Sequence, residues 1–205
     1  MRTKFAVIAD LHVDIMHDTE ERLRVFLDAA LAADVDFVIQ LGDFCYPDDN
    51  RRCICAPEKR PENIENALNF PTYADKKAIN ELYRTFPKPT YHVIGNHDCD
   101  MCKKREVLDY YGADYEPYYS FDFGDFHFIV LDPNYYKKDG EYVSYECGNY
   151  FDESYHKVPV LPYLPKEELE WLKADLESTD RMSVIFTHQS LKENEDGAIL
   201  NAPEF

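Results

Sequence analysis

The apolar positions of the chain form short buried runs and amphipathic stripes that follow one another along the sequence. Residues 4–10 and 36–42 are short apolar runs rich in β-branched and aromatic side chains, so each predicts a buried strand. Between them, residues 18–33 carry one apolar stripe and predict a helix, with Asp18 as its cap and Glu21 at the reciprocal position. Strand, helix and strand in this order predict a βαβ unit with parallel strands and a right-handed crossover.

The same alternation continues to the end of the chain. The other predicted elements are a helix over 71–86, a strand over 90–94, a helix over 103–111 closed by Gly112, a hairpin of 118–123 with 126–132, a helix from Pro165 and a strand over 182–187. Two stretches, 44–70 and 134–164, lack a clear period, and we interpret them as inserts that shape a pocket. The pattern therefore predicts a single α/β domain spanning residues 1–205.

Composition and charge narrow the range of functions. Apolar residues make up 45% of the chain, which is enough for a packed core. The net charge of −18 repels phosphate backbones, so neither general nucleic-acid binding nor an exonuclease-like activity is expected. A small phosphorylated substrate would need local positive charge from arginine, lysine or bound metal. The sequence shows no signal peptide and no apolar run of transmembrane length, which predicts a cytoplasmic protein without a membrane partner.

The cysteines allow two interpretations. There are six of them: Cys45, Cys53, Cys55, Cys99, Cys102 and Cys147. In a reducing compartment we interpret them as free thiols. A zinc site built from the Cys53–Cys55 and Cys99–Cys102 pairs is the alternative, although the wide gap and unequal spacings make that signal weak.

Four of the predicted strands end in residues that can bind metal ions. These residues are Asp10 and His12, then Gly42-Asp43, then Gly95-Asn96-His97-Asp98, and finally His188. In open α/β sheets, ligands bind beyond the carboxyl ends of the strands, so four distant segments can converge on one edge. Each segment alone is also typical of a turn or a packed histidine. Together, and in this order, they predict a reaction site.

The order of these motifs resembles that of the calcineurin-like metallophosphoesterase superfamily. Its pattern is Asp-x-His, Gly-Asp, Gly-Asn-His-Asp/Glu, a strand-terminal His, and Gly-His-x-His. The first four parts are present as Asp10-Leu11-His12, Gly42-Asp43, Gly95-Asn96-His97-Asp98 and His188. The resemblance spans nearly the whole chain, and it implies a four-layer α/β/β/α sandwich with a binuclear metal site.

The resemblance also implies a metal-ligand set. Asp10, His12 and Asp43 would hold the first ion, and Asp43 would bridge to a second ion that also binds Asn96 and His188. Mixed nitrogen and oxygen ligands suit Mn, Fe, Zn or Co, and the sequence does not choose among them. The implied reaction is attack of a metal-bridging hydroxide on the phosphorus of a phosphomonoester or phosphodiester.

Two further residues take catalytic roles in this scheme. His97 would face the substrate, stabilise the transition state and protonate the leaving alkoxide. Asp98 would accept the other ring N–H of His97 and fix its tautomer, which is compatible with a role in the turn.

Other polar residues near the motifs need separate interpretation. Gly42-Asp43-x-x-Tyr46 resembles a purple acid phosphatase motif in which the tyrosine binds ferric iron. That family lacks a histidine at the position of His12, so we interpret Tyr46 as a wall residue. The histidines that match no motif position are His17, His92, His127 and His156. Of these, His92 and His127 are predicted to pack within strands.

The closing Gly-His-x-His is absent, since no histidine follows His188. We interpret the chain as a C-terminally truncated version of a longer phosphoesterase, with a natural short form as the alternative. Either case predicts weakened metal affinity. Missing strands would leave a sheet edge exposed and favour self-association.

The alternative function is a catalytically weak or inactive fold used as a protein-binding scaffold, but the presence of His97 and Asp98 favours the enzyme.

Overall fold

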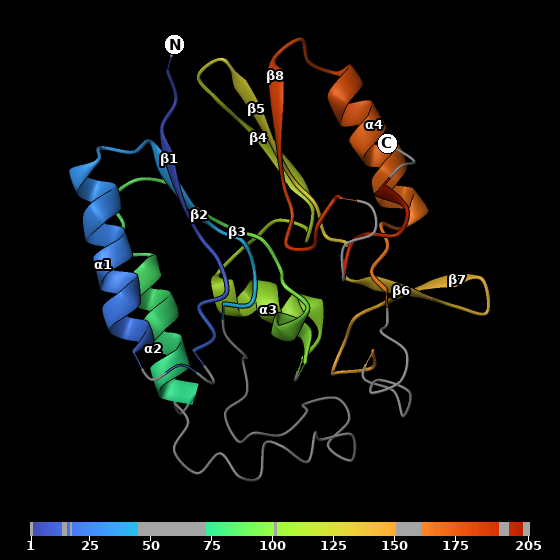
Figure 1. Cartoon of the computed structure of the whole chain (residues 1–205), viewed down its shortest axis with the longest axis horizontal. Helices are drawn as coiled ribbons and strands as arrows, with labels where there is room; N and C mark the ends of the chain where they lie inside the picture. Colours follow the sequence, from blue (N-terminus) through green and yellow to red (C-terminus); the bar gives the residue numbers. More distant parts are fainter. Residues whose placement is uncertain are drawn as a thin grey trace.

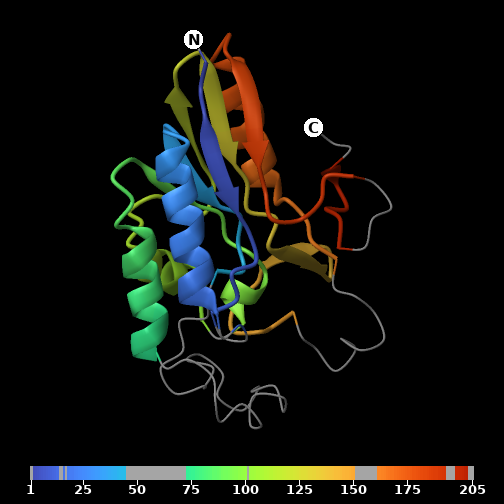
Figure 2. The same ribbon diagram turned by 60° about the vertical axis from the view of Figure 1, so that its left-hand side comes forward.

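The computed structural model describes residues 2–13, 16, 18–44, 73–100, 102–150, 161–192 and 197–202. These residues are arranged in layers (Figure 1). Helices α1 (Thr19–Ala32) and α2 (Tyr73–Tyr83) lie side by side over one face of the first sheet (Figure 2). The second sheet packs on the other face, and α4 (Lys166–Glu177) covers its outer side. This arrangement agrees with the predicted α/β/β/α order.

The first sheet contains the predicted βαβ unit. Its strands are β1 (Phe5–Ile8), β2 (Phe37–Gln40) and β3 (Thr90–His92), which are parallel in the order β1-β2-β3. The central strand β2 is buried along its whole length, because helices cover one face of the sheet and the second sheet covers the other. The parallel alignment brings the carboxyl ends of all three strands to one edge.

The second sheet contains the predicted hairpin and the last predicted strand. Strands β4 (Tyr119–Phe123) and β5 (Phe126–Val130) are antiparallel, with Phe123 opposite Phe126 across the turn at Gly124-Asp125. Gly124 has φ +58°, a conformation that two-residue hairpin turns require. Strand β8 (Met182–Phe186) pairs with β5 in parallel.

Three hydrophobic clusters fill the spaces between the layers, and the period of two along each strand decides which residue enters which cluster. On β2, Val38 faces the helices, whereas Phe37 and Ile39 face the second sheet. On β5, Phe128 faces the first sheet and Ile129 packs toward α4. The rings of Phe37 and Phe128 meet edge to face with centroids 5.0 Å apart, a geometry that contributes about 0.5–1.5 kcal/mol beyond area burial.

Most predicted elements are confirmed, and two local predictions are wrong. Helix α3 (Lys104–Tyr111) ends at Gly112 in the left-handed conformation, as expected. Asp18, however, makes no side-chain cap bond to α1. The stretch predicted to be irregular contains a hairpin of β6 (Tyr135–Lys138) and β7 (Glu141–Ser144). The Asp-Gly pair between these strands is a strong hairpin signal, and it is visible in the sequence.

The prediction of six free thiols is wrong. Cys147 is disulfide-bonded, whereas Cys99 and Cys102 are buried thiols. Nearly all of the insert at 44–70 lies outside the described part of the chain. The residues singled out in the sequence that lie outside it are His17, Cys45, Tyr46, Cys53, Cys55 and His156.

Strands β1 and β8 lie at the edges of their sheets among the described residues, and they carry exposed apolar side chains such as Val7 and Met182. Self-association through such an edge stays a prediction. Within the described ranges, no helix combines the length and apolar character needed to cross a membrane.

His127 is packed within its strand, as predicted, and it joins the second sheet to α4. Its Nδ1 lies 2.8 Å from Oδ1 of Asp122 on β4, and its Nε2 lies 2.7 Å from Oδ2 of Asp175 on α4. Burial alone would lower the pKa of His127, but hydrogen bonds and attraction to the two carboxylates outweigh it and raise the pKa. The charged imidazolium is therefore the form that stabilises this contact.

We predict that His127→Gln destabilises the protein in a pH-dependent way. A raised folded-state pKa means that the stabilisation is complete below the unfolded-state pKa of about 6.5 and is lost as the pH rises through the folded-state value. The loss should be about 1–3 kcal/mol near pH 6 and smaller at higher pH. Urea denaturation of both proteins across this range measures it. An equal loss at all pH values would contradict the assignment.

Candidate metal centre

The segments that follow β1 and β2 run side by side beyond the sheet. The backbone N–H of Asp10 donates to the carbonyl oxygen of Gly42 at 3.1 Å, and that of His12 donates to the carbonyl oxygen of Asp43 at 3.0 Å. Asp10, His12 and Asp43 all have left-handed backbones, with φ of 53°, 48° and 52°. Non-glycine residues rarely adopt this conformation, and when they do the surrounding contacts hold them there.

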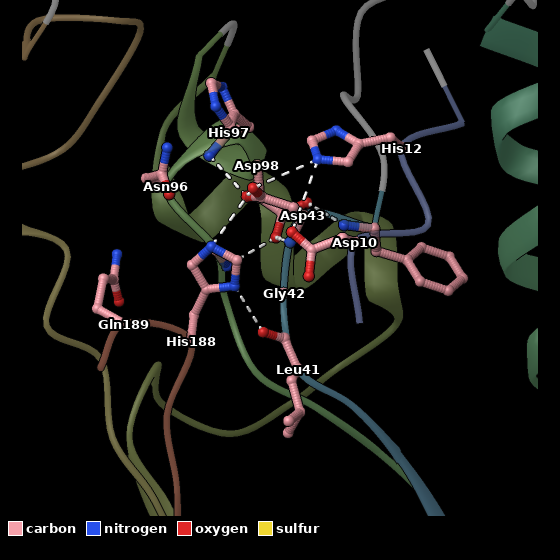
Figure 3. Close-up of polar contacts among 12 residues, drawn as sticks. Asp10, His12, Leu41, Gly42, Asp43, Asn96, His97, Asp98, His188 and Gln189 are labelled. Carbon is pink, nitrogen blue, oxygen red and sulfur yellow. Dashed lines mark hydrogen bonds and ion pairs between the residues drawn. The ribbon is translucent and has the colours of Figure 1, made fainter. Parts of the chain in front are cut away.

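The carboxylate of Asp43 lies at the centre of the site (Figure 3). Its Oδ2 is 3.6 Å from Nε2 of His12 and 3.3 Å from Nε2 of His188. Its Oδ1 accepts the backbone N–H of His97 at 2.8 Å. Ligand atoms of Asp10, His12 and Asp43 all lie within 4.8 Å of one another, which is close enough for one cation to contact all three.

His188 is oriented by the residue that follows β2. Its Nδ1 lies 2.7 Å from the carbonyl oxygen of Leu41, which can only accept, so Nδ1 carries the proton and Nε2 faces Asp43. This arrangement is typical of metal-binding histidines. Burial would lower the pKa of His188, but the hydrogen bond and charge of Asp43 raise it to about 9. Burial of Asp43 would raise its pKa, but His188 outweighs this effect and lowers it.

Two glycines allow the turns after β2 and β3 to touch. Gly42 has φ +98°, and a Cβ there would lie 2.6 Å from the backbone nitrogen of Gly95. A Cβ on Gly95 would lie only 2.2 Å from Oδ1 of Asp43. Because any side chain would separate these backbones, both positions require glycine.

Asp98 holds the same two turns together. Its Oδ2 accepts the backbone N–H groups of Asp43 at 2.9 Å and Gly95 at 2.8 Å, and its Oδ1 accepts that of Phe44 at 3.0 Å. The side chain is fully buried. Burial first, and then the charge of Asp43, raise the pKa of Asp98 to about 7, although the hydrogen bond from Gly95 opposes the shift.

The prediction that Asp98 accepts the ring N–H of His97 is therefore wrong. The Nδ1 of His97 lies 2.9 Å from Oδ2 of Asp100 instead. The reason is the 3₁₀ turn η3 (His97–Cys99), in which side chains three residues apart lie on the same side. Sequence reasoning missed Asp100, although the spacing of an aspartate three residues after the histidine was visible.

The structure brings most of the predicted site residues together around Asp43. Asn96 lies half-buried in the turn that contains His97, and the ring centroids of His97 and His12 are 5.7 Å apart. The carboxylates and imidazoles form a mixed oxygen and nitrogen donor set, which suits Mn, Fe, Zn or Co. These donor atoms, with Nε2 of His188 facing the Asp43 carboxylate, fit a bound cation.

Comparisons with known proteins identify a similar family and a similar fold. The calcineurin-like phosphoesterase family profile matches residues 3–202. No curated protein matches the chain. Among solved structures, a dimetal phosphatase from Danio rerio is similar in fold, with 16% sequence identity and a TM-score of 0.65. The similarity covers 98% of this chain and 75% of that chain.

We predict that Gly95→Ala impairs metal binding, because the new Cβ would displace the Asp43 carboxylate. The expected cost is about 1–3 kcal/mol of stability and at least a tenfold loss of Zn²⁺ or Mn²⁺ affinity, measured by thermal unfolding and calorimetric titration. Gly140→Ala is the control. Gly140 has φ +90°, and a Cβ there would have nothing within 4 Å, so alanine adds only backbone strain. Equal metal affinity in the two variants would contradict the prediction.

Proposed function

Because the chain belongs to the calcineurin-like phosphoesterase family, we propose that it is a metal-dependent phosphoesterase acting on a small phosphorylated substrate, either a phosphomonoester or a phosphodiester. The observation that carries this proposal is the position of the Asp43 carboxylate, with Oδ2 facing the Nε2 atoms of both His12 and His188. A carboxylate between two imidazoles can be shared by two cations.

The family resemblance implies two ligand sets that share this carboxylate. Asp10, His12 and Asp43 would hold one ion, and Asp43, Asn96 and His188 would hold the other. The fold similarity to a dimetal phosphatase supports two ions. When bound, the ions supply Lewis-acid stabilisation of the phosphate charge and lower the pKa of water. They would also supply the positive charge that a protein of net charge −18 needs to bind a phosphate.

His97 is placed to act on the leaving group. Its backbone N–H donates to Oδ1 of Asp43 at 2.8 Å. This hydrogen bond fixes the residue at the centre of the site and does not involve the imidazole ring. The side chain is about one-third exposed, at 32%, and can reach a bound substrate. The imidazole would donate a proton to the leaving oxygen as the bond to phosphorus breaks.

We predict that Asp43→Ala abolishes metal-dependent hydrolysis. Loss of the shared ligand should reduce turnover of an aryl phosphate or bis-aryl phosphate at least about a thousandfold, since metal stabilisation contributes several kcal/mol. The assay uses chelator-treated protein resupplied with Mn²⁺, Zn²⁺, Fe²⁺ or Co²⁺. Asp139→Ala is the matched control, because Asp139 has the same left-handed backbone at φ 53° but is exposed on the β6–β7 turn. Unchanged turnover in Asp43→Ala would contradict the proposed function, whereas a wild type without metal-dependent turnover would favour the non-catalytic scaffold.

We predict a different result for His97→Ala. Turnover should fall about 10²- to 10⁴-fold, the usual range for a general acid, while the bound metal measured by elemental analysis stays as in the wild type. The unchanged metal content follows because the bond to Asp43 comes from the backbone of His97. Loss of metal in parallel with activity would assign the ring to the ligand set instead.

A further inference from the structure

The segment after β7 packs against the turn that carries His97. The backbone N–H of Cys147 donates to the carbonyl oxygen of Cys102 at 2.9 Å, and that of Gly148 donates to the carbonyl oxygen of Cys99 at 3.0 Å. Tyr150 follows in this segment and is 4% exposed. Its ring stacks on that of Tyr145, with centroids 4.2 Å apart and planes within 15°. Backbone and ring contacts thus fix where the Tyr150 hydroxyl lies.

That hydroxyl reaches two groups of the site. It lies 2.8 Å from the carbonyl oxygen of Asn96 and within hydrogen-bond distance of Oδ1 of Asp100. A hydroxyl has one proton to donate, so the two acceptors share it or one of them takes it. The other carboxylate oxygen of Asp100, Oδ2, lies 2.9 Å from Nδ1 of His97. Hydroxyl, carboxylate and imidazole therefore form one continuous chain.

We propose that Asp100 and Tyr150 are positioning residues that set the tautomer and orientation of His97 in the reaction. This inference rests on the proposed phosphoesterase function. The Asp100 carboxylate accepts the Nδ1–H of His97, which assigns Nε2 to the substrate. Tyr150 in turn holds Asp100 and, through the Asn96 carbonyl, the turn on which His97 stands. Neither residue touches the substrate.

Loss of this positioning should lower the rate of hydrolysis by an amount that depends on the leaving group. A poor leaving group such as phenolate needs a proton as it departs, whereas nitrophenolate leaves with little help. A misplaced His97 ring should therefore slow phenyl esters much more than nitrophenyl esters. A general loss of folding or of metal would slow both substrates alike.

The test measures kcat and KM of wild type, Asp100→Asn and Tyr150→Phe on phenyl and 4-nitrophenyl phosphate esters, with Mn²⁺ or Zn²⁺ supplied. For phenyl esters we expect kcat to fall about 10- to 100-fold in Asp100→Asn and less in Tyr150→Phe. For nitrophenyl esters the change should be small, with KM and metal content preserved. Adding Asp100→Asn to His97→Ala should cause no further loss, because both act through one imidazole.

Asp122→Asn is the matched control. Asp122 also holds a carboxylate oxygen close to a histidine Nδ1, at 2.8 Å from that of His127. This pair lies in the β4–β5 hairpin and not in the site. This variant should keep the leaving-group dependence of the wild type. An equal loss on both esters in Asp100→Asn, or an additive loss with His97→Ala, would overturn the proposal.

A second readout separates this proposal from the proposed function. The ring ¹⁵N resonances of His97 in the Zn²⁺-loaded protein should show the Nδ1–H tautomer in the wild type, and a tautomer mixture in both variants. If the wild type is inactive but the tautomer depends on Asp100 and Tyr150, the phosphoesterase proposal fails and the positioning chain stands. If the tautomer is the same in all three proteins, the positioning chain is wrong whatever the activity.

Discussion

The buried carboxylate of Asp98 is the contact on which the site depends. It accepts backbone N–H groups from Asp43, Phe44 and Gly95, which belong to turns after two different strands. Each of these donors would cost about 1–3 kcal/mol if it were left unsatisfied in the interior. The carboxylate therefore joins the ends of β2 and β3 and fixes the separation of the residues they carry.

The other features of the site follow from that close approach. Gly42 and Gly95 must lack side chains because their backbones nearly touch. Asp43 adopts a left-handed backbone at the junction, and its carboxylate then points between His12 and His188. A parallel sheet supplies the rigid frame, since its strand ends meet at one edge. Three of the proposed ligands, Asp10, His12 and Asp43, are thus held on left-handed backbones.

Much of this arrangement could be predicted from the sequence, because buried strands and polar strand ends both leave clear patterns. The βαβ unit and the convergence of Asp10, His12, Asp43 and His188 follow from those patterns. The partner of His97 could not be assigned in this way, because the choice between Asp98 and Asp100 depends on a 3₁₀ turn of three residues. The role of Tyr150 could not be predicted either, because it arises from packing between segments far apart in sequence.

The central claim is that Asp43 is shared between two metal ions, and anomalous diffraction from crystals of the chain grown with Mn²⁺ or Zn²⁺ tests it most directly. We expect two anomalous peaks beside the Asp43 carboxylate, one toward Asp10 and His12 and the other toward His188. A single peak that does not contact Asp43, or no peak at this edge of the sheet, would contradict the claim.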